Sequence, residues 1–284
     1  MDERFTHLVV PLDLESCGDQ SLDVARDLSF LGRAPIELVV VLPDTFDVAS
    51  GISNLADRAR AHRLPEHTAV VLSGNDPAKA IAEHLLTLEA PLVVLATAAH
   101  GPVGELLAAS ASARFMSLVE SPVLVVGPHV SDRALPLAPT LLACIGPSGE
   151  SDPTLQVMAR WVHTFGGPEP WFVEVLAPSG SAPDTGGDVR ESALVQRRSE
   201  QLARMGVSSE WEVLHGNDLV DAVERFAADV TEPVLVAESV HWTDPEHMHL
   251  HSAARRLAHR ARHPVLVVPH AGRHLDAAVA PSRR

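Results

Sequence analysis

The chain contains Pro122-Val-Leu-Val-Val126, and the same five residues recur as Pro264-Val-Leu-Val-Val268. Two further pairs of segments are separated by the same offset in residue number: Val71-Leu-Ser-Gly-Asn-Asp76 with Val213-Leu-His-Gly-Asn-Asp218, and Pro91-Leu-Val-Val-Leu95 with Pro233-Val-Leu-Val-Ala237. The first apolar runs of the two halves, 8–13 and 141–146, have a shorter offset. Segments that recur at a fixed distance indicate two copies of one structural unit.

In both halves, short apolar runs alternate with stretches of helical period. In the first half we expect strands at 7–12, 36–42, 68–72, 92–96 and 123–126, and helices at 21–31, 51–62, 77–88 and 110–119. In the second half the expected strands are 141–145, 171–176, 210–214, 234–237 and 265–268. Continuous apolar runs are typical of strands that helices cover on both faces. The alternation therefore predicts an α/β fold of two Rossmann-like, doubly wound, five-stranded parallel sheets in tandem. We expect a first domain at 1–128, a linker at 129–139, a second domain at 140–270 and a C-terminal tail at 271–284.

The composition disfavours several classes of function. The net charge is −15, from 37 acidic against 22 basic residues, which disfavours binding to nucleic acid or to anionic membranes. No apolar run approaches the ~20 residues of a membrane span, and the first residues lack a signal-peptide pattern. The two cysteines, Cys17 and Cys144, are expected to be reduced thiols, and Cys144 to be inert because it lies in an apolar strand. We therefore expect a cytoplasmic protein.

In open parallel sheets, ligands bind beyond the carboxyl ends of the strands, where the strand order reverses. The relevant loops follow the first and fourth strands. Asp13 follows the first strand, and its carboxylate is suited to accept hydrogen bonds from ribose hydroxyls. The fourth strand leads through residues 96–110 into a helix, whose N-terminus can hold an anion. Asp76 is expected to cap the expected helix at 77–88, and Pro77 to begin it.

This layout resembles the universal stress protein family over nearly the whole chain, in two copies. In the ATP-binding members of that family, an Asp at the end of the first strand contacts the adenosine. Their motif G-x2-G-x9-G-S/T after the fourth strand holds the phosphates. The resemblance implies the adenine nucleotide alpha hydrolase-like fold. It also implies candidate nucleotide contacts in the first half at Asp13, Ala96, Ala99, Ala109, Ser110 and Ser112.

Each motif glycine is an alanine in the first half, and alanine adds a β-carbon where phosphate approaches the backbone. We therefore expect ATP binding to be weakened there, unless Gly101 and Gly104 form a shifted cradle. In the second half Gly146 replaces the Asp, and Glu238 stands at the first glycine position. Its carboxylate would repel a triphosphate, so we expect ATP binding to be lost there.

Several alternatives stay open. Asp13 is either a ligand contact or a cap of the first helix, and Ser110 and Ser112 are either phosphate contacts or helix caps. A histidine cluster, His247, His249 and His251, offers metal-ligand atoms, although a solvated polar loop explains it better.

No catalytic motif is present: there is no nucleophile elbow, no Walker loop and no Cys paired with His by pattern. We expect a stress-associated regulatory or binding protein rather than an enzyme, with slow ATP hydrolysis left open. The alternative is an ATP-binding stress sensor that uses the first-half site, with ATP as its one expected cofactor. The resemblance further implies that the two halves pair through their last strands. A homodimer and unidentified protein partners are left open.

Overall fold

The computed structural model describes residues 4–13, 19–43, 45–97, 115–130, 138–145, 152–176, 185–238 and 253–269. For residues 152 and 185–192 it describes the backbone alone. The first half consists of β1 (His7–Pro11), α1 (Gln20–Gly32), β2 (Ile36–Leu42), α2 (Val48–Ala61), β3 (His67–Ser73), α3 (Pro77–Leu85), β4 (Pro91–Ala96) and β5 (Val123–Val126). The second half consists of β6 (Thr140–Ile145), α5 (Asp152–Phe165), β7 (Trp171–Leu176), α6 (Thr185–Arg204), β8 (Glu210–His215), α7 (Leu219–Ala227), β9 (Pro233–Glu238), α8 (Ala253–Arg260) and β10 (Val265–Val268).

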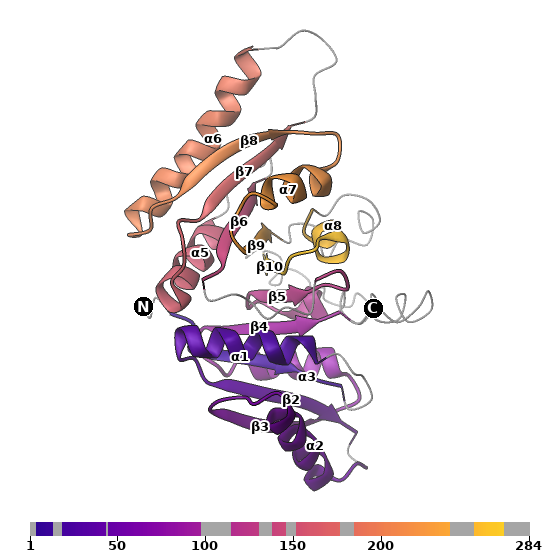
Figure 1. The fold of residues 1–284 in the computed structure, drawn as a ribbon. Helices are drawn as coiled ribbons and strands as arrows, with labels where there is room; N and C mark the ends of the chain where they lie inside the picture. Colours follow the sequence, from indigo (N-terminus) through magenta and orange to yellow (C-terminus); the bar gives the residue numbers. More distant parts are fainter. Residues whose placement is uncertain are drawn as a thin grey trace, which may run out of the picture.

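The predicted α/β class with a mainly parallel sheet is confirmed, and every predicted strand forms within one residue of its expected bounds. The expected separation into two five-stranded sheets is not confirmed. The strands form a single ten-stranded sheet in the order β3-β2-β1-β4-β5-β10-β9-β6-β7-β8 (Figure 1). Within each half all neighbouring strands are parallel, and β5 and β10 are antiparallel where the halves meet.

The register of the β5–β10 pair relates the halves by symmetry. Leu124 lies opposite Leu266, and Val125 and Val123 lie opposite Val265 and Val267. Leu124 and Leu266 are the middle leucines of the two Pro-Val-Leu-Val-Val segments, so each is the repeat counterpart of the other. A pseudo-twofold axis therefore passes through the sheet between them. The eight residues of the two strands are all buried.

The core forms two layers, one on each face of the sheet, and both layers run across the junction of the halves. One layer lies under α1, α2, α5 and α6 and includes Leu8, Leu124, Leu141 and Leu266. The other lies under α3, α7 and α8 and includes Val123 and Val265. Consecutive strand residues alternate between the layers because side chains point to opposite faces of a sheet.

Local signals explain the ends of the first-half helices. Asp47 caps α2, with its carboxylate accepting hydrogen bonds from the N–H groups of Ala49 and Ser50, so this helix begins earlier than the expected residue 51. As predicted, Asp76 caps α3 and Pro77 begins it. The predicted helix at 110–119 is described only from residue 115, and residues 115–118 are helical. No helix within the described ranges is long and apolar enough to cross a membrane.

Two tryptophans of the second half differ in burial. Trp161 is fully buried. Trp171 is partly buried and packs edge-on against Phe226 with ring centroids 5.2 Å apart. Burial raises the pKa of the Cys144 thiol to about 12, which agrees with an unreactive cysteine.

One buried polar pair in the first half has an aromatic counterpart in the second. The ring of His84 on α3 donates from Nε2 to Oε1 of Glu37, which is 8% exposed in β2. Val9 lies opposite Glu37, whereas its counterpart Leu142 lies opposite Trp171. Since residue 226 is the counterpart of His84, the Trp171–Phe226 pair occupies the same place in the second half.

We expect His84→Phe to lower the free energy of unfolding by about 2 kcal/mol, because it leaves the buried carboxylate of Glu37 without the imidazole. Glu37→Leu with His84→Phe is expected to recover most of this loss, as an apolar pair fills this place in the other half. Urea unfolding at pH 7 measures the double variant and each of its two single variants, His84→Phe and Glu37→Leu. A loss in the double variant equal to the sum of the two single losses would contradict the pairing.

Candidate functional site

The strand order reverses at β1 in the first half, because β2 lies on one side of β1 and β4 on the other. The carboxyl ends of β1 and β4 therefore form the switch point at which α/β sheets bind ligands. β6 occupies the same position in the second half, between β7 and β9. The loops that follow these strands, 14–18, 98–114, 146–151 and 239–252, lie outside the described residues.

Two of the candidate nucleotide contacts can be placed. Asp13 is exposed and lies two residues beyond the end of β1, where the Leu12 N–H donates to the carbonyl of Val39 at 2.8 Å. Ala96 ends the adjacent strand β4 and lies opposite Val126. The structure thus brings Asp13 and Ala96 to the same edge of neighbouring strands. The other four candidates, Ala99, Ala109, Ser110 and Ser112, lie outside the described residues.

Arg58 is a residue at this edge that the sequence analysis missed. Its Nη1 donates to the backbone carbonyl of Asp13 at 2.7 Å, and its Nη2 lies 3.5 Å from Oδ1 of Asp19. The Arg58 side chain is 14% exposed. It therefore ties α2 to the segment that carries Asp13 and to the start of α1. The signal was its spacing, since Arg58 follows the buried Leu55 by three residues on the inner side of α2.

His62 extends this contact along α1. Its Nε2 lies 3.3 Å from Oδ2 of Asp19 and its Nδ1 lies 3.1 Å from Oδ1 of Asp23. Arg26 donates to Asp23 at 2.8 Å and to the His62 carbonyl at 3.3 Å. Because these groups are partly exposed, each of these polar contacts contributes about 1 kcal/mol or less. Together they fix the orientation of α2 against α1 beside the candidate site.

The second-half edge carries different chemistry. Glu238 ends β9 opposite Val268, so a carboxylate stands where the first half has Ala96. Gly146 and the histidine candidates His247, His249 and His251 lie outside the described residues. Within the described ranges, no group of three or more His, Cys, Asp or Glu side chains could hold a metal ion. The metal hypothesis for the histidine cluster stays a prediction.

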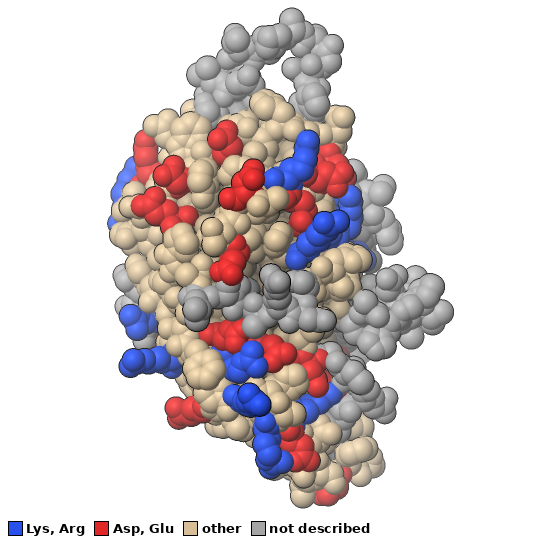
Figure 2. Space-filling view, viewed as in Figure 1, with Lys and Arg blue, Asp and Glu red and all other residues tan. Residues whose placement is uncertain are grey.

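Asp218 joins α7 to α8 in the second half. Its Oδ1 caps α7 by accepting from the Val220 N–H at 2.8 Å, and its Oδ2 accepts from Arg256 at 2.6 Å and from Arg260 at 3.0 Å. The hydrogen bond from Arg260 is the main cause that lowers the pKa of Asp218 to about 2. In Figure 2, blue and red atoms lie side by side over these two helices. Through Arg256 and Arg260, the cluster holds α8 along its length against the start of α7.

The first half has the same cap but lacks one of the two arginines. Asp76, the counterpart of Asp218, caps α3 by accepting from the Lys79 N–H at 3.4 Å. The counterpart of Arg260 is Leu118, whose side chain carries no charge. The counterpart of Arg256 is Arg114, which lies outside the described residues. The ion pair between Arg260 and Asp218 is therefore specific to the second half.

We expect Asp218→Asn to lower the free energy of unfolding by about 1 kcal/mol at pH 7, since it removes the charge that two arginines bind. The folded-state pKa lies below the ordinary 3.8, so the charge stabilises the fold above pH 4. This contribution is lost as the pH falls toward about 2, so the difference between the wild type and Asp218→Asn should shrink there. Denaturant unfolding across this pH range measures it.

Arg260→Leu supplies the matched control, because it gives the second half the residue that the first half has at this position. The loss caused by Asp218→Asn should be smaller in the Arg260→Leu background, where Arg256 alone binds the carboxylate. An equal loss in both backgrounds would contradict a role for Arg260.

The comparisons with known proteins concern the fold. The chain superimposes on a universal stress protein from Archaeoglobus fulgidus DSM 4304 with a TM-score of 0.67, at 16% identity, over 94% of this chain and 97% of that one. A putative universal stress protein from Pseudomonas aeruginosa UCBPP-PA14 matches with a TM-score of 0.63, at 13% identity, over 94% of each chain. The chain has the fold of the universal stress proteins.

The fold by itself does not select a function. The cytoplasmic domain of a prokaryotic cation chloride cotransporter also matches, with a TM-score of 0.51 at 14% identity, over 93% of this chain and 95% of that domain. No protein-family model matches the sequence, and no curated protein matches it. The function must therefore be argued from the residues at the two switch points.

Proposed function

We propose that the chain is a tandem universal stress protein that acts as a stress-associated regulatory or binding protein rather than as an enzyme. Its first half keeps a weakened site for ATP or a related adenine nucleotide, and its second half has lost that site. Two observations support the tandem assignment. The likeness to a universal stress protein covers 94% of the chain, and the same strand order occurs in each half.

The placement of Asp13 carries the assignment of the site to the first half. Asp13 lies at the carboxyl edge, next to the switch point between β1 and β4, and Arg58 holds its backbone there. The alanine at 96 leaves the end of β4 uncharged. In the second half, residue 146 is a glycine and Glu238 brings a negative charge to the same edge. A phosphate chain is therefore accommodated better at the first switch point than at the second.

The proposal that the chain is not an enzyme rests on the amino-acid sequence of the segment that follows the first-half switch point. A general base or a metal carboxylate would have to stand within hydrogen-bond reach of the γ-phosphate or of its attacking water. Residues 96–110 contain one acidic residue, Glu105, and one histidine, His100, and no catalytic motif in the sequence assigns either of them to this task. Nucleotide binding without turnover suits a protein that reports on a nucleotide or presents a surface to a partner.

We expect ATP to raise the melting temperature of the intact chain, whereas the Asp13→Ala variant should not respond. A ligand at ten times its Kd adds roughly 1.4 kcal/mol to the stability, which corresponds to about 3 °C for a chain of this size. Thermal unfolding with ATP, AMP and cyclic AMP at millimolar concentrations measures the effect. Asp76→Ala is the control, since it removes a first-half carboxylate that caps α3 rather than following β1.

The outcomes separate the alternatives. An ATP shift that persists unchanged in Asp13→Ala would contradict the first-half site. Tight binding, seen as nucleotide that co-purifies and is released on denaturation, would favour the ATP-binding sensor over the weakened site. No shift with any of the three nucleotides would refute the weakened site. A protein that acts only through contacts with other proteins would then be the remaining proposal.

A further inference from the structure

The α1–α5 contact at the junction of the halves places a glycine against an aromatic ring. Gly32 is the last residue of α1 and packs against the end of α5. A β-carbon at residue 32 would lie 2.7 Å from Cδ1 of Phe165 and 2.9 Å from Cγ2 of Thr164. Carbon atoms do not approach this closely, so residue 32 must be glycine while Phe165 keeps its position.

Gly32 and Phe165 occupy the same position of the two repeats. They are separated by the offset of the first strands, and each is the last residue of its helix. The residues that follow them, Arg33 and Gly166, both have positive φ angles, 54° and 71°. A pseudo-twofold axis brings a position and its counterpart together, as it does for Leu124 and Leu266. At this place the axis therefore brings a glycine to a phenylalanine.

The contacts that surround Gly32 and Phe165 also lack a symmetric counterpart across the pseudo-twofold axis. The Phe5 N–H donates to Oγ1 of Thr164 at 2.8 Å, and the Phe5 ring stacks on Phe165 with centroids 5.9 Å apart. The counterparts of Phe5 and Thr164 are Ala138 and Leu31. Alanine has no ring and leucine has no hydroxyl, so the reverse contact cannot form.

On the opposite face of the sheet, a second glycine also differs from its repeat counterpart. A β-carbon on Gly127, which directly follows β5, would lie 2.6 Å from the backbone carbonyl oxygen of Ala258 on α8. The counterpart of Gly127 is Pro269, which carries a β-carbon. A second half placed where the first half stands would therefore collide with the backbone of α8.

We propose that these contacts make the junction surface of each half specific for the unlike half and exclude a second copy of itself. Two first halves would set Gly32 against Gly32 and leave the space of a phenyl ring unfilled. Two second halves would set Phe165 against Phe165, and Pro269 against the carbonyl of Ala258. The β5–β10 ladder cannot make this choice, because Val-Leu-Val-Val is identical in both strands. Side chains at the axis supply the discrimination instead.

Three full-length variants recreate the like pairings within one chain. Gly32→Phe gives the phenylalanine pair, Phe165→Gly gives the glycine pair, and the double variant exchanges the two residues. We expect each single variant to lower the melting temperature by about 5–10 °C, through overpacking or through a cavity. The exchanged variant should regain at least half of the summed loss, since one glycine again faces one phenylalanine. A loss equal to the sum would refute the proposal.

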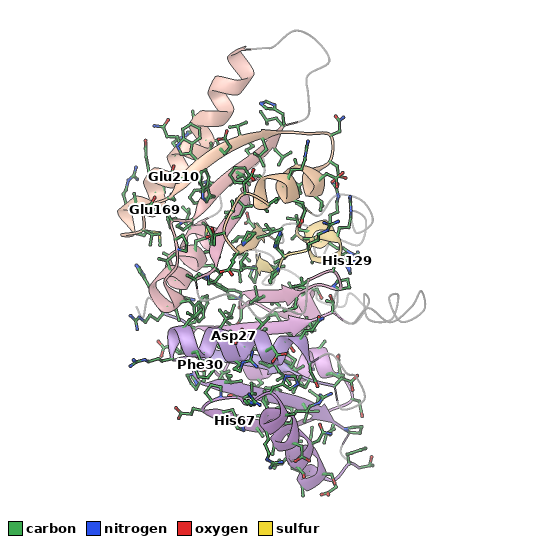
Figure 3. All side chains as sticks on the ribbon, viewed as in Figure 1. Asp27, Phe30, His67, His129, Glu169 and Glu210 are labelled. Carbon is green, nitrogen blue, oxygen red and sulfur yellow. The ribbon has the colours of Figure 1, made fainter. Side chains whose placement is uncertain are left out.

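Two controls isolate the contact. Phe30→Gly changes an exposed phenylalanine of the same helix α1 (Figure 3) and measures the cost of glycine in a helix without loss of packing. If Gly32→Phe does not fold, an alanine cycle replaces it. Gly32→Ala should lower the melting temperature more in the presence of Phe165 than in the Phe165→Ala background, where the close contact with Thr164 is left for the new β-carbon. An equal change in both backgrounds would overturn the proposal.

Discussion

The outermost strand of each half at the junction, β5 or β10, is entirely apolar and needs a partner strand along its open edge. Val-Leu-Val-Val offers no charge or proline to prevent association, and an outer strand exposes unpaired N–H and C=O groups. The antiparallel pairing of β5 with β10 satisfies these groups and buries all eight side chains. Because Leu124 and Leu266 meet on the pseudo-twofold axis, the pairing also continues both core layers from one half into the other. The sheet, the core and the α1–α5 contact all depend on this one ladder.

On that shared scaffold the two halves have diverged. Arg58 holds the Asp13 segment in the first half, whereas Arg260 binds Asp218 in the second, where the first half has a leucine. The buried Glu37–His84 pair has an aromatic pair as its counterpart. These differences are consistent with the division of roles that we propose, with a ligand edge in the first half and a structural partner in the second. The same divergence at Gly32 and Phe165 fits the halves to each other.

Much of the fold could be predicted from the sequence, because a strand covered on both faces is a continuous apolar run and every such run formed a strand. The cap Asp76 is a local signal and was equally visible, and its repeat counterpart Asp218 caps α7 in the same way. The joining of ten strands in one sheet did not follow from the residues themselves, because the apolar pattern of β5 is the same whether its free edge is paired or open, and only the family resemblance implied pairing through the last strands. The contacts of Arg58 and of the cluster at Asp218 could not be predicted from the sequence for a related reason. Their partners are distant in the chain, and only the packing of helices brings them together.

The central claim is that β5 and β10 form the interior of one continuous sheet. Native-state hydrogen exchange, resolved at residues 123–126 and 265–268, tests it most directly. If the ladder joins the halves, these amides exchange only through global unfolding, far more slowly than those at the outer edges of β3 and β8. Exchange of the β5 and β10 amides as fast as at those outer edges would show that the two strands are not paired.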